Sequence, residues 1–499
     1  MVYRKILFDR TYRQRNLTFL AISLFVGALF VSLFSLSTSP LYHNYGWDSV
    51  VWQIIGKYWV KDGTLPYVGL WDHKGPFIHF VNCLGYLITG NVTGIFILQI
   101  LNLSLTFYIF FRTYSLTFNS RQSLLFSVLS LIWLLVSYEE GNLTEEYMLP
   151  WISIIVFLVQ RWLISEKNLP SISHFDQNIG FWGGVVFGLS AMTRLTNAIP
   201  VCGILFFAGC VLLYNKKFMD VLKFVGLFLV GSALIIVPFV IYFASKGALY
   251  DMWFSTFAFN FQYGVRSIGL NGKKLILMHH VLNILPIIVL TCLSFYLLFC
   301  GRKWRFYALL LILAVVPYLS FLVFSQHYNH YNMVLIPLAS FLVYLLHIFL
   351  RGDSVFHKSI FSLVLFGSFL SGYSFRSAKE SFSFKFSEPE IEKITKVFSA
   401  NDVDTSSVQL WDLHPRLYLS LDIKPVYAHF FTQSWHSSFC EESYDRILAE
   451  ERSLNAKFQL VNCSNTKIIQ EVLDNNYTLV YSMHVYAWDF DIALYKRNF

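Results

Sequence analysis

Long apolar segments recur along the sequence from its start to about residue 375. About 20 apolar residues, at 1.5 Å each, cross the roughly 30 Å hydrocarbon core of a bilayer. The short segment 180–193 is rich in glycine, so ten and twelve spans remain alternatives to our count of about eleven. The predicted spans are 17–36, 93–111, 122–138, 147–164, 180–193, 197–214, 219–244, 276–299, 306–325, 333–350 and 359–375.

The composition agrees with a polytopic α-helical membrane protein. Of the 499 residues, 56% are hydrophobic and only 14% are charged, whereas soluble domains carry about 25% charged residues. The net charge of +8 comes mostly from short loops between apolar segments. We therefore expect membrane lipid, and no nucleic acid, among the partners.

Basic residues in alternate loops predict the orientation. The basic N-terminus precedes a first span that no Ala-x-Ala-like cleavage site ends, so we expect this span to be retained. Cytoplasmic loops of membrane proteins carry an excess of Lys and Arg. The N-terminus is thus predicted in the cytoplasm and the C-terminus outside it, in a multi-pass protein of the cell membrane. The basic loops hold Arg112 and Arg121, Arg161 and Lys167, Lys216 and Lys217, Arg302, Lys303 and Arg305, and Arg351 and Lys358.

Two domains are expected. Residues 1–375 form the transmembrane part, whose first outer loop is 37–76, with 77–87 too short to cross and so placed at the interface. Residues 376–499 are more polar and read as a small extracytoplasmic α/β domain. Its strand-like runs are Val408–Trp411, 478–481 and 491–495, and its helical candidates lie near 388–397 and 468–473. Cys440 and Cys463 lie in this domain, and the sequence leaves their pairing open.

Many residues whose side chains could take part in catalysis or binding lie in the predicted outer loops and at the outer ends of the spans. We therefore predict a shared site on that side of the membrane. Signatures of soluble enzymes, such as a glycine-rich phosphate loop, a nucleophile elbow or His-Glu-x-x-His, are missing from the sequence. The outer polar residues are Asp48, Asp72, His73, Lys74, Glu139, Glu140, Glu145, Glu146, Arg194, Arg266, His327, Tyr328 and His330.

Several motifs occur in a definite order along these loops. They are Gly46-Trp47-Asp48, Gly63-Thr64-Leu65-Pro66-Tyr67, Asp72-His73-Lys74-Gly75-Pro76, Gly141–Tyr147, His327–Tyr331 and, in the tail, Leu410-Trp411-Asp412 with Pro415-Arg416-Leu417-Tyr418. This order resembles bacterial members of the GT-C superfamily of polyprenyl-phosphate-dependent glycosyltransferases, in the protein-mannosyltransferase and aminoarabinose-transferase branch (glycosyltransferase family 39-like). Two positions depart from the family pattern: Ser49 follows Asp48 where many members have a second acid, and His73 separates Asp72 from Lys74.

The resemblance implies transfer of a sugar from a polyprenyl-phosphate donor to a cell-surface glycan, teichoic acid, lipid or protein, with inversion. Asp48 would be the general base. Lys74, Arg194, Tyr328 and His330 would bind the donor phosphate. The supporting or acceptor-binding residues would be Asp72, His73, Glu145, Glu146 and His327. No cofactor follows with certainty, and a divalent cation is a candidate because His327 and His330 are three residues apart.

Each of these residues also has a structural interpretation. Asp48 suits the N-cap of the amphipathic run that follows it, and Lys74 suits a contact with lipid headgroups. Asp72 suits an ion pair with Lys74. Glu145 and Glu146 suit the N-terminus of a helix, where acidic side chains are favoured.

Two other classes of function remain open. A transporter or flippase of lipid-linked sugars is one, although such proteins place charges near mid-membrane and often show inverted repeats, neither of which is evident here. A non-catalytic envelope assembly protein, with the tail as a binding module, is the other. An enzyme requires Asp48 for product formation, whereas a binding protein does not.

Overall fold

The computed structural model describes residues 10–42, 46–166, 171–264, 285–324, 328–349, 388–432, 436, 440–485 and 490–498. These residues are mostly helical and include one small sheet. They belong to two compact units, which we call the helical unit and the mixed unit. The helical unit comprises 1–41, 96–240 and 271–376, and the mixed unit comprises 42–95, 241–270 and 377–499.

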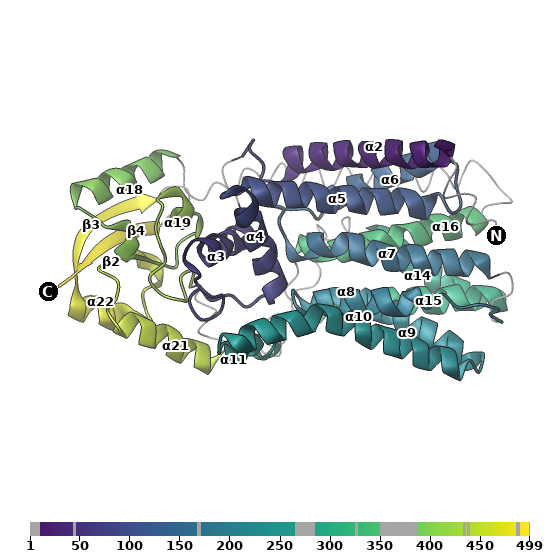
Figure 1. The fold of residues 1–499 in the computed structure, drawn as a ribbon. Coiled ribbons are helices and arrows are strands. Elements are labelled where there is room, and N and C mark those ends of the chain that lie inside the picture. Colours follow the sequence, from purple (N-terminus) through teal and green to yellow (C-terminus); the bar gives the residue numbers. More distant parts are fainter. Residues whose placement is uncertain are drawn as a thin grey trace. The chain divides into compact units, whose positions relative to one another are not determined.

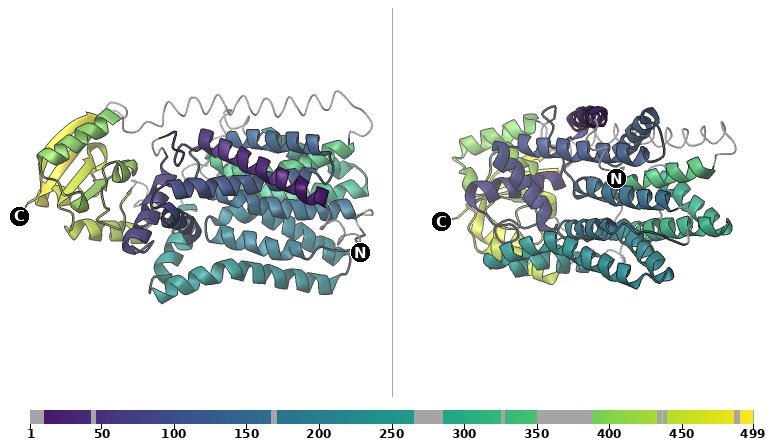
Figure 2. Two further views of the ribbon diagram at one scale, coloured as in Figure 1. Left: turned by 45° about the horizontal axis from the view of Figure 1, so that its top comes forward. Right: turned by 45° about the vertical axis from the view of Figure 1, so that its right-hand side comes forward.

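The helical unit consists of helices that lie side by side (Figures 1 and 2). Two of them, α5 and α10, continue for a few residues into the mixed unit. The elements are α2 (Arg10–Phe34), α5 (Thr93–Tyr114), α6 (Ser120–Leu135), α7 (Thr144–Ser165), α8 (Asn178–Ala191), η1 (Leu195–Ala198), α9 (Ile199–Tyr214), α10 (Phe218–Ser245), α14 (Leu285–Phe299), α15 (Arg302–Phe324), η3 (Asn329–Leu338) and α16 (Ala339–Phe349).

Six helical segments among the described residues are long and apolar enough to cross a membrane, which agrees with a multi-pass membrane protein. They are Asn16–Phe34, Thr93–Tyr114, Thr144–Ser165, Leu195–Tyr214, Phe218–Ser245 and Trp304–Phe321. The predicted spans at 122–138 and 180–193 correspond to the shorter helices α6 and α8. The predicted span 359–375 and the first part of 276–299 lie outside the described residues, so the number of about eleven stays a prediction.

The segment 333–350 differs from the single α-helix that its apolar composition predicts. Its first residues belong to the 3-10 helix η3, and the α-helix α16 begins only at Ala339, two residues after Pro337. Proline lacks the N–H that an α-helix interior requires, so the change of helix type at this point has a local cause. A 3-10 helix of ten residues is longer than usual, and such stretches often mark a functional or strained segment.

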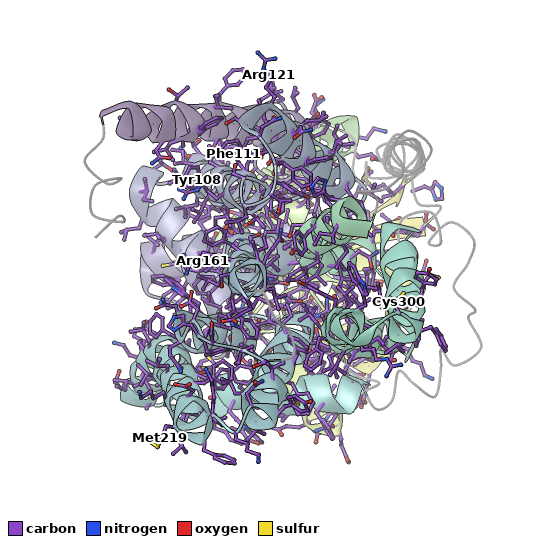
Figure 3. All side chains as sticks on the ribbon, turned by 90° about the vertical axis from the view of Figure 1, so that its right-hand side faces the viewer. Tyr108, Phe111, Arg121, Arg161, Met219 and Cys300 are labelled. Atoms are coloured by element: carbon purple, nitrogen blue, oxygen red, sulfur yellow. The ribbon has the colours of Figure 1, made fainter. Side chains whose placement is uncertain are left out.

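One end of the helical unit carries basic side chains. Arg112 lies in the last turn of α5 and Arg161 in the last turns of α7, while Arg121 lies in the first turn of α6. Figure 3 looks onto these helix ends and labels Arg121 and Arg161. These three basic residues of the predicted cytoplasmic loops therefore lie at one end of the unit.

The mixed unit combines helices of the first loop with the C-terminal region. Helices α3 and α4 pack closely because Gly56 has no side chain: a Cβ there would lie 2.6 Å from the backbone carbon of Asn82. The elements are α3 (Asp48–Asp62), α4 (Pro76–Thr89), α11 (Leu249–Trp253), the π-helical turn η2 (Phe254–Ala258), α18 (Glu388–Ala400), η4 (Thr405–Ser407), β1 (Val408–Trp411), α19 (Arg416–Ser420), α21 (Glu441–Arg452), β2 (Phe458–Asn462), η5 (Cys463–Asn465), α22 (Gln470–Asn476), β3 (Tyr477–Val485) and β4 (Phe490–Arg497).

The sheet has four strands in the order β1-β2-β4-β3. Strands β1 and β2 are parallel, with Val408 opposite Phe458, and the other two pairs are antiparallel. A core that includes Trp411, Ile447, Val461 and Leu473 joins the sheet to α21 and α22, and α18 lies on the other side of the sheet (Figure 1). The predicted strands and the helix near 388–397 are present, so a small α/β arrangement exists in the tail. Cys440 is buried and Cys463 exposed, and both are free thiols.

The first loop contacts the tail within the mixed unit. The backbone N–H of Trp71 donates to the carbonyl of Ala428 at 2.8 Å, and the indole ring stacks on the imidazole of His429 with ring centroids 4.9 Å apart. The hydroxyl of Tyr58 donates to the carbonyl of Ile423 at 3.1 Å. The expected domain boundary at 375/376 lies outside the described residues and stays a prediction; the observed grouping places loop and tail together.

Candidate functional site

In the helical unit, the predicted polar residues come to the helix ends opposite those that carry Arg121 and Arg161. They lie between α6 and α7, between α8 and α9, and at the start of η3. The turn before α7 is left-handed at three positions, with φ of 46° at Glu139, 75° at Gly141 and 55° at Asn142. Gly141 is required there, because a Cβ would also lie 2.6 Å from the Ser35 hydroxyl oxygen.

Glu145, which is buried, forms an ion pair with the half-buried Arg194. Oε1 of Glu145 lies 3.0 Å from Nη1 of Arg194, and the hydroxyl of Thr144 donates to Oε2 at 2.8 Å. The guanidinium carbon lies 3.4 Å from the centroid of the Tyr331 ring, so the aromatic face covers the cation. Arg194 is therefore held by one carboxylate and one ring.

Glu146 is buried beside this pair and accepts several hydrogen bonds. The amide of Gln99 donates at 2.9 Å to Oε2, the hydroxyl of Tyr138 at 2.8 Å to Oε1, and the backbone N–H of Asn142 at 2.7 Å to Oε2. A buried carboxylate with three donors is satisfied without a cation. Its contacts tie the left-handed turn to α5 and α7.

His330 pairs with a carboxylate that the left-handed turn presents. Nδ1 of His330 lies 2.8 Å from Oε2 of Glu139, and the Tyr328 ring stacks on the imidazole with centroids 5.6 Å apart. The helical unit thus brings together Glu139, Glu145, Arg194 and the Tyr328–His330 segment. His327 and Arg266 lie outside the described residues.

In the mixed unit, Asp48 lies in the first turn of α3. Trp47 occupies the N-cap position and makes no side-chain cap hydrogen bond, so Asp48 is the first helical residue rather than the cap. Four residues later, on the same face, Trp52 is buried and its indole N–H donates to Oδ2 of Asp72 at 2.9 Å. The Trp71–Lys74 loop is thereby joined to the start of α3.

Asp72 is buried among two histidines. Its carboxylate lies 3.4 Å from Nδ1 of His73 and 3.5 Å from Nε2 of His79. Burial raises the pKa of Asp72, while the charge of Lys74 and hydrogen bonds from neighbouring N–H groups oppose this effect. Burial lowers the pKa of His79 to about 3, so this ring is neutral near pH 7 and the Asp72–His79 contact is not an ion pair.

Lys74 is half-buried, and its ammonium lies 2.9 Å from Nε2 of His73. The loop that carries it is fixed by two further contacts. The Tyr67 hydroxyl donates to the Lys74 carbonyl at 2.8 Å, and the Asn260 amide donates to the His73 carbonyl. The expected Asp72–Lys74 ion pair is replaced by these contacts, with His73 between the two side chains.

The predicted residues therefore form two groups, one in each unit. Tyr331, the last residue of the His327–Tyr331 motif, covers Arg194. Gln99, Tyr138, Trp52 and His79 complete these groups, and the sequence motifs did not include them. Each lies in an apolar segment or next to one of the motifs named above. A single polar or aromatic residue in such a place does not by itself indicate a functional role. The carboxylate of Glu145 pairs with Arg194, and that of Glu146 accepts hydrogen bonds. Among the described residues, no three His, Cys, Asp or Glu side chains are placed to share a metal ion.

Comparison with known proteins finds relatives by structure only: no family model and no curated protein matches the sequence. ArnT from Cupriavidus metallidurans, crystallised bound to undecaprenyl phosphate, is 12% identical with a TM-score of 0.57, and the match covers 95% of this chain and 97% of that one. The Archaeoglobus fulgidus oligosaccharyltransferase tethered to an acceptor peptide is 12% identical with a TM-score of 0.52, and the match covers 95% and 73%. Its apo form is 11% identical with a TM-score of 0.51 over 96% and 74%.

At these identities the likeness establishes the fold. This fold agrees with the resemblance to GT-C glycosyltransferases that the loop and tail motifs indicated, because the matches to ArnT and to the Archaeoglobus fulgidus oligosaccharyltransferase each cover 95% of this chain.

Proposed function

We propose that this protein is a membrane glycosyltransferase that moves a sugar from a polyprenyl-phosphate donor to a cell-surface acceptor on the extracytoplasmic face. The observation that carries the proposal is the fold match to ArnT, which extends over 95% of this chain and 97% of that one. ArnT was crystallised with undecaprenyl phosphate, the lipid that such a donor releases. The candidate acceptors are a glycan, teichoic acid, lipid or protein.

The reaction needs a base, and we assign that role to Asp48. An acceptor hydroxyl attacks the anomeric carbon from the face opposite the phosphate, and its proton passes to the Asp48 carboxylate. The bond from the anomeric carbon to the phosphate oxygen breaks, so polyprenyl phosphate leaves with the bonding electrons and the product has inverted configuration. General base catalysis of this kind is typically worth about 10²–10⁴-fold.

The departing phosphate needs cations, because negative charge grows on it as the bond breaks. We assign Lys74 to this role, with Arg194, Tyr328 and His330 as further phosphate contacts. One well-placed donor at a developing charge is typically worth about 10²–10³-fold. Arg194 has only one carboxylate partner in the described contacts, Glu145, so its remaining N–H groups suit a second anion.

The supporting residues hold these groups in place. Asp72 and His73 position Lys74, and Glu145 and Glu146 position Arg194 and the turn before α7. We retain His327 as an acceptor-side residue. In this proposal the chain crosses the membrane about eleven times, with the N-terminus in the cytoplasm and the 376–499 domain outside.

The test compares surface glycans by mass spectrometry in cells with and without the protein. Loss of one sugar from one class of surface molecule, restored by the wild-type chain and not by Asp48→Asn, supports the proposal. In sealed vesicles the enzyme releases undecaprenyl phosphate and forms a new glycoside. Movement of an intact lipid-linked sugar across the vesicle membrane without a new glycoside would instead identify a transporter.

A further inference from the structure

We infer that His414, in the tail segment that follows strand β1, holds the start of helix α3 in place and is a positioning residue for Asp48. This rests on the proposed function, because it takes Asp48 as the base. The segment follows strand β1 and belongs to the same compact unit as α3. The tail would then be part of the catalytic apparatus rather than a separate binding module.

Within the described residues, the N-cap position of α3 is occupied by a tryptophan. Trp47 at the N-cap has helical dihedral angles (φ −94°, ψ −62°) and makes no side-chain cap hydrogen bond. A cap side chain normally fixes the first turn of a helix. Here the Trp47 ring packs edge-on against the imidazole of His414, with ring centroids 4.7 Å apart and planes at 67°. The tail thus supplies a restraint directly beside Asp48.

His414 is itself rigidly held. It is 6% exposed, and its Nδ1 accepts the backbone N–H of Arg416 at 3.1 Å. The carbonyl of His414 accepts the N–H of Leu417 at 3.1 Å. Because Nδ1 is an acceptor, the neutral ring carries its proton on Nε2. The imidazole is thus bonded to the turn that follows strand β1 and packs against Trp47.

The same tail segment contacts the other end of α3. The Tyr58 hydroxyl donates to the carbonyl of Ile423 at 3.1 Å, and the ammonium of Lys57 lies 2.9 Å from Oδ1 of Asp422. The side chain of Asp422 is 79% exposed, and exposed ion pairs contribute little to stability. The Lys57–Asp422 pair is therefore a matched control for the contact between Trp47 and His414.

Positioning matters because proton transfer requires a distance of about 2.6–3.2 Å between base and acceptor oxygen. A displacement of about 1 Å far from the chemistry can cost roughly 10²-fold in rate. His414→Ala removes the ring and should lower kcat about 10- to 100-fold. KM for the donor should change less than about threefold, since His414 contacts Trp47 and is not among the residues that we assign to the donor phosphate. His414→Phe keeps an aromatic ring against Trp47 and should recover much of kcat.

The experiment uses the full-length protein in nanodiscs with a panel of undecaprenyl-phosphate-linked sugars and membrane extract as acceptor. Released undecaprenyl phosphate gives kcat and KM, and hydrogen–deuterium exchange of residues 47–52 reports the start of α3 without any substrate. We expect His414→Ala to raise exchange there and lower kcat, His414→Phe to restore both in large part, and Asp422→Ala to leave both within twofold of wild type.

Two results separate this inference from the proposed function. If the wild-type protein releases undecaprenyl phosphate and His414→Ala does so equally fast, the inference is wrong and the proposed function stands. Unchanged exchange at 47–52 in His414→Ala also overturns the inference. If the wild-type protein releases no undecaprenyl phosphate from any member of the panel, the proposed function fails first, and the positioning role fails with it.

Discussion

The carboxylate of Glu145 lies 3.0 Å from the guanidinium of Arg194 and is almost completely buried. The pair connects the first turn of α7 to the segment between α8 and α9, and Tyr331 of η3 covers the cation. Three separate elements of the helical unit therefore depend on one ion pair.

Glu145→Gln should destabilise the protein by up to about 3 kcal/mol, because it leaves the half-buried Arg194 guanidinium without a countercharge. Thermal unfolding in detergent measures the change. The double variant Glu145→Gln/Arg194→Met should regain part of the stability, since both charges are then absent. If Arg194 also binds phosphate, added undecaprenyl phosphate should stabilise Glu145→Gln more than the wild type. Equal stabilisation would leave Arg194 a purely structural residue.

Asp48→Asn should fold, insert and bind undecaprenyl phosphate, while sugar transfer falls at least about 10²-fold, because an amide cannot accept the proton of the acceptor hydroxyl. Turnover at matched expression is the measurement. The structural alternative is an interaction of Asp48 with the N-terminus of α3, worth about 0.3–1 kcal/mol. In that case Asp48→Asn would lower stability slightly and leave turnover unchanged, and Glu145 and Glu146 would be the next candidates for the base.

Lys74→Ala should weaken binding of undecaprenyl phosphate and raise KM for the donor, because the ammonium provides a compact charge for the phosphate. Lys74→Arg should restore binding only in part, since the planar guanidinium differs in shape and hydration. Binding is measured by the shift in thermal stability on adding undecaprenyl phosphate. Lys57→Ala, which removes another lysine cation from the same unit, is the control. Unchanged binding in Lys74→Ala would reduce this lysine to a contact with lipid headgroups.

The tail should lose stability as the pH rises from about 4.5 to about 8. Glu451 is 2% exposed, burial raises its pKa to about 8, and the Gln459 amide donates to it at 2.6 Å. Between the unfolded and folded pKa values the native state binds more protons than the unfolded state, so unfolding becomes easier with increasing pH. This dependence should amount to a few kcal/mol in the free energy of unfolding, and Glu451→Gln should remove most of it. Hydrogen exchange of β1 and β2 at pH 6 and pH 8 is the measurement. The same pH dependence in the variant would contradict the assignment.

The orientation is tested by a reporter that is active only in the cytoplasm. Fused after Phe499, it should be silent, and fused in the basic loop between α9 and α10 it should be active. An active C-terminal fusion would mean that the number of spans is even. The tail would then lie in the cytoplasm, which would contradict a reaction on the extracytoplasmic face.

Apolar length predicted the helices of the helical unit well, because each spanning helix satisfies its own backbone hydrogen bonds. The predicted span 93–111 corresponds to α5 at Thr93–Tyr114, and 197–214 corresponds to α9 at Ile199–Tyr214. The strand β1 matches its predicted residues, and β3 and β4 extend beyond theirs. Strand β2 and helix α21 were not predicted, and α21 is rich in charged residues.

The partners of the candidate residues could not be predicted, because they come from distant parts of the chain. Arg194 meets Glu145 and Tyr331, and Asp72 meets Trp52 and His79, through packing that no local pattern encodes. The association of the first loop with the tail was missed for the same reason. Sequence motifs identified polar positions, and tertiary structure decided which of them share a hydrogen bond.

The backbone hydrogen bond between Trp71 and Ala428 can form only after the tail has been synthesised. The two residues are about 360 positions apart, so at 5–20 residues per second translation needs roughly 20–70 s to deliver the second after the first. During that interval the aromatic surface of the first loop has no tail to cover it. The nascent chain should therefore be most exposed to membrane-bound chaperones and proteases while its middle spans are being made, and a stop codon before residue 428 should leave a chain that is inserted but quickly degraded.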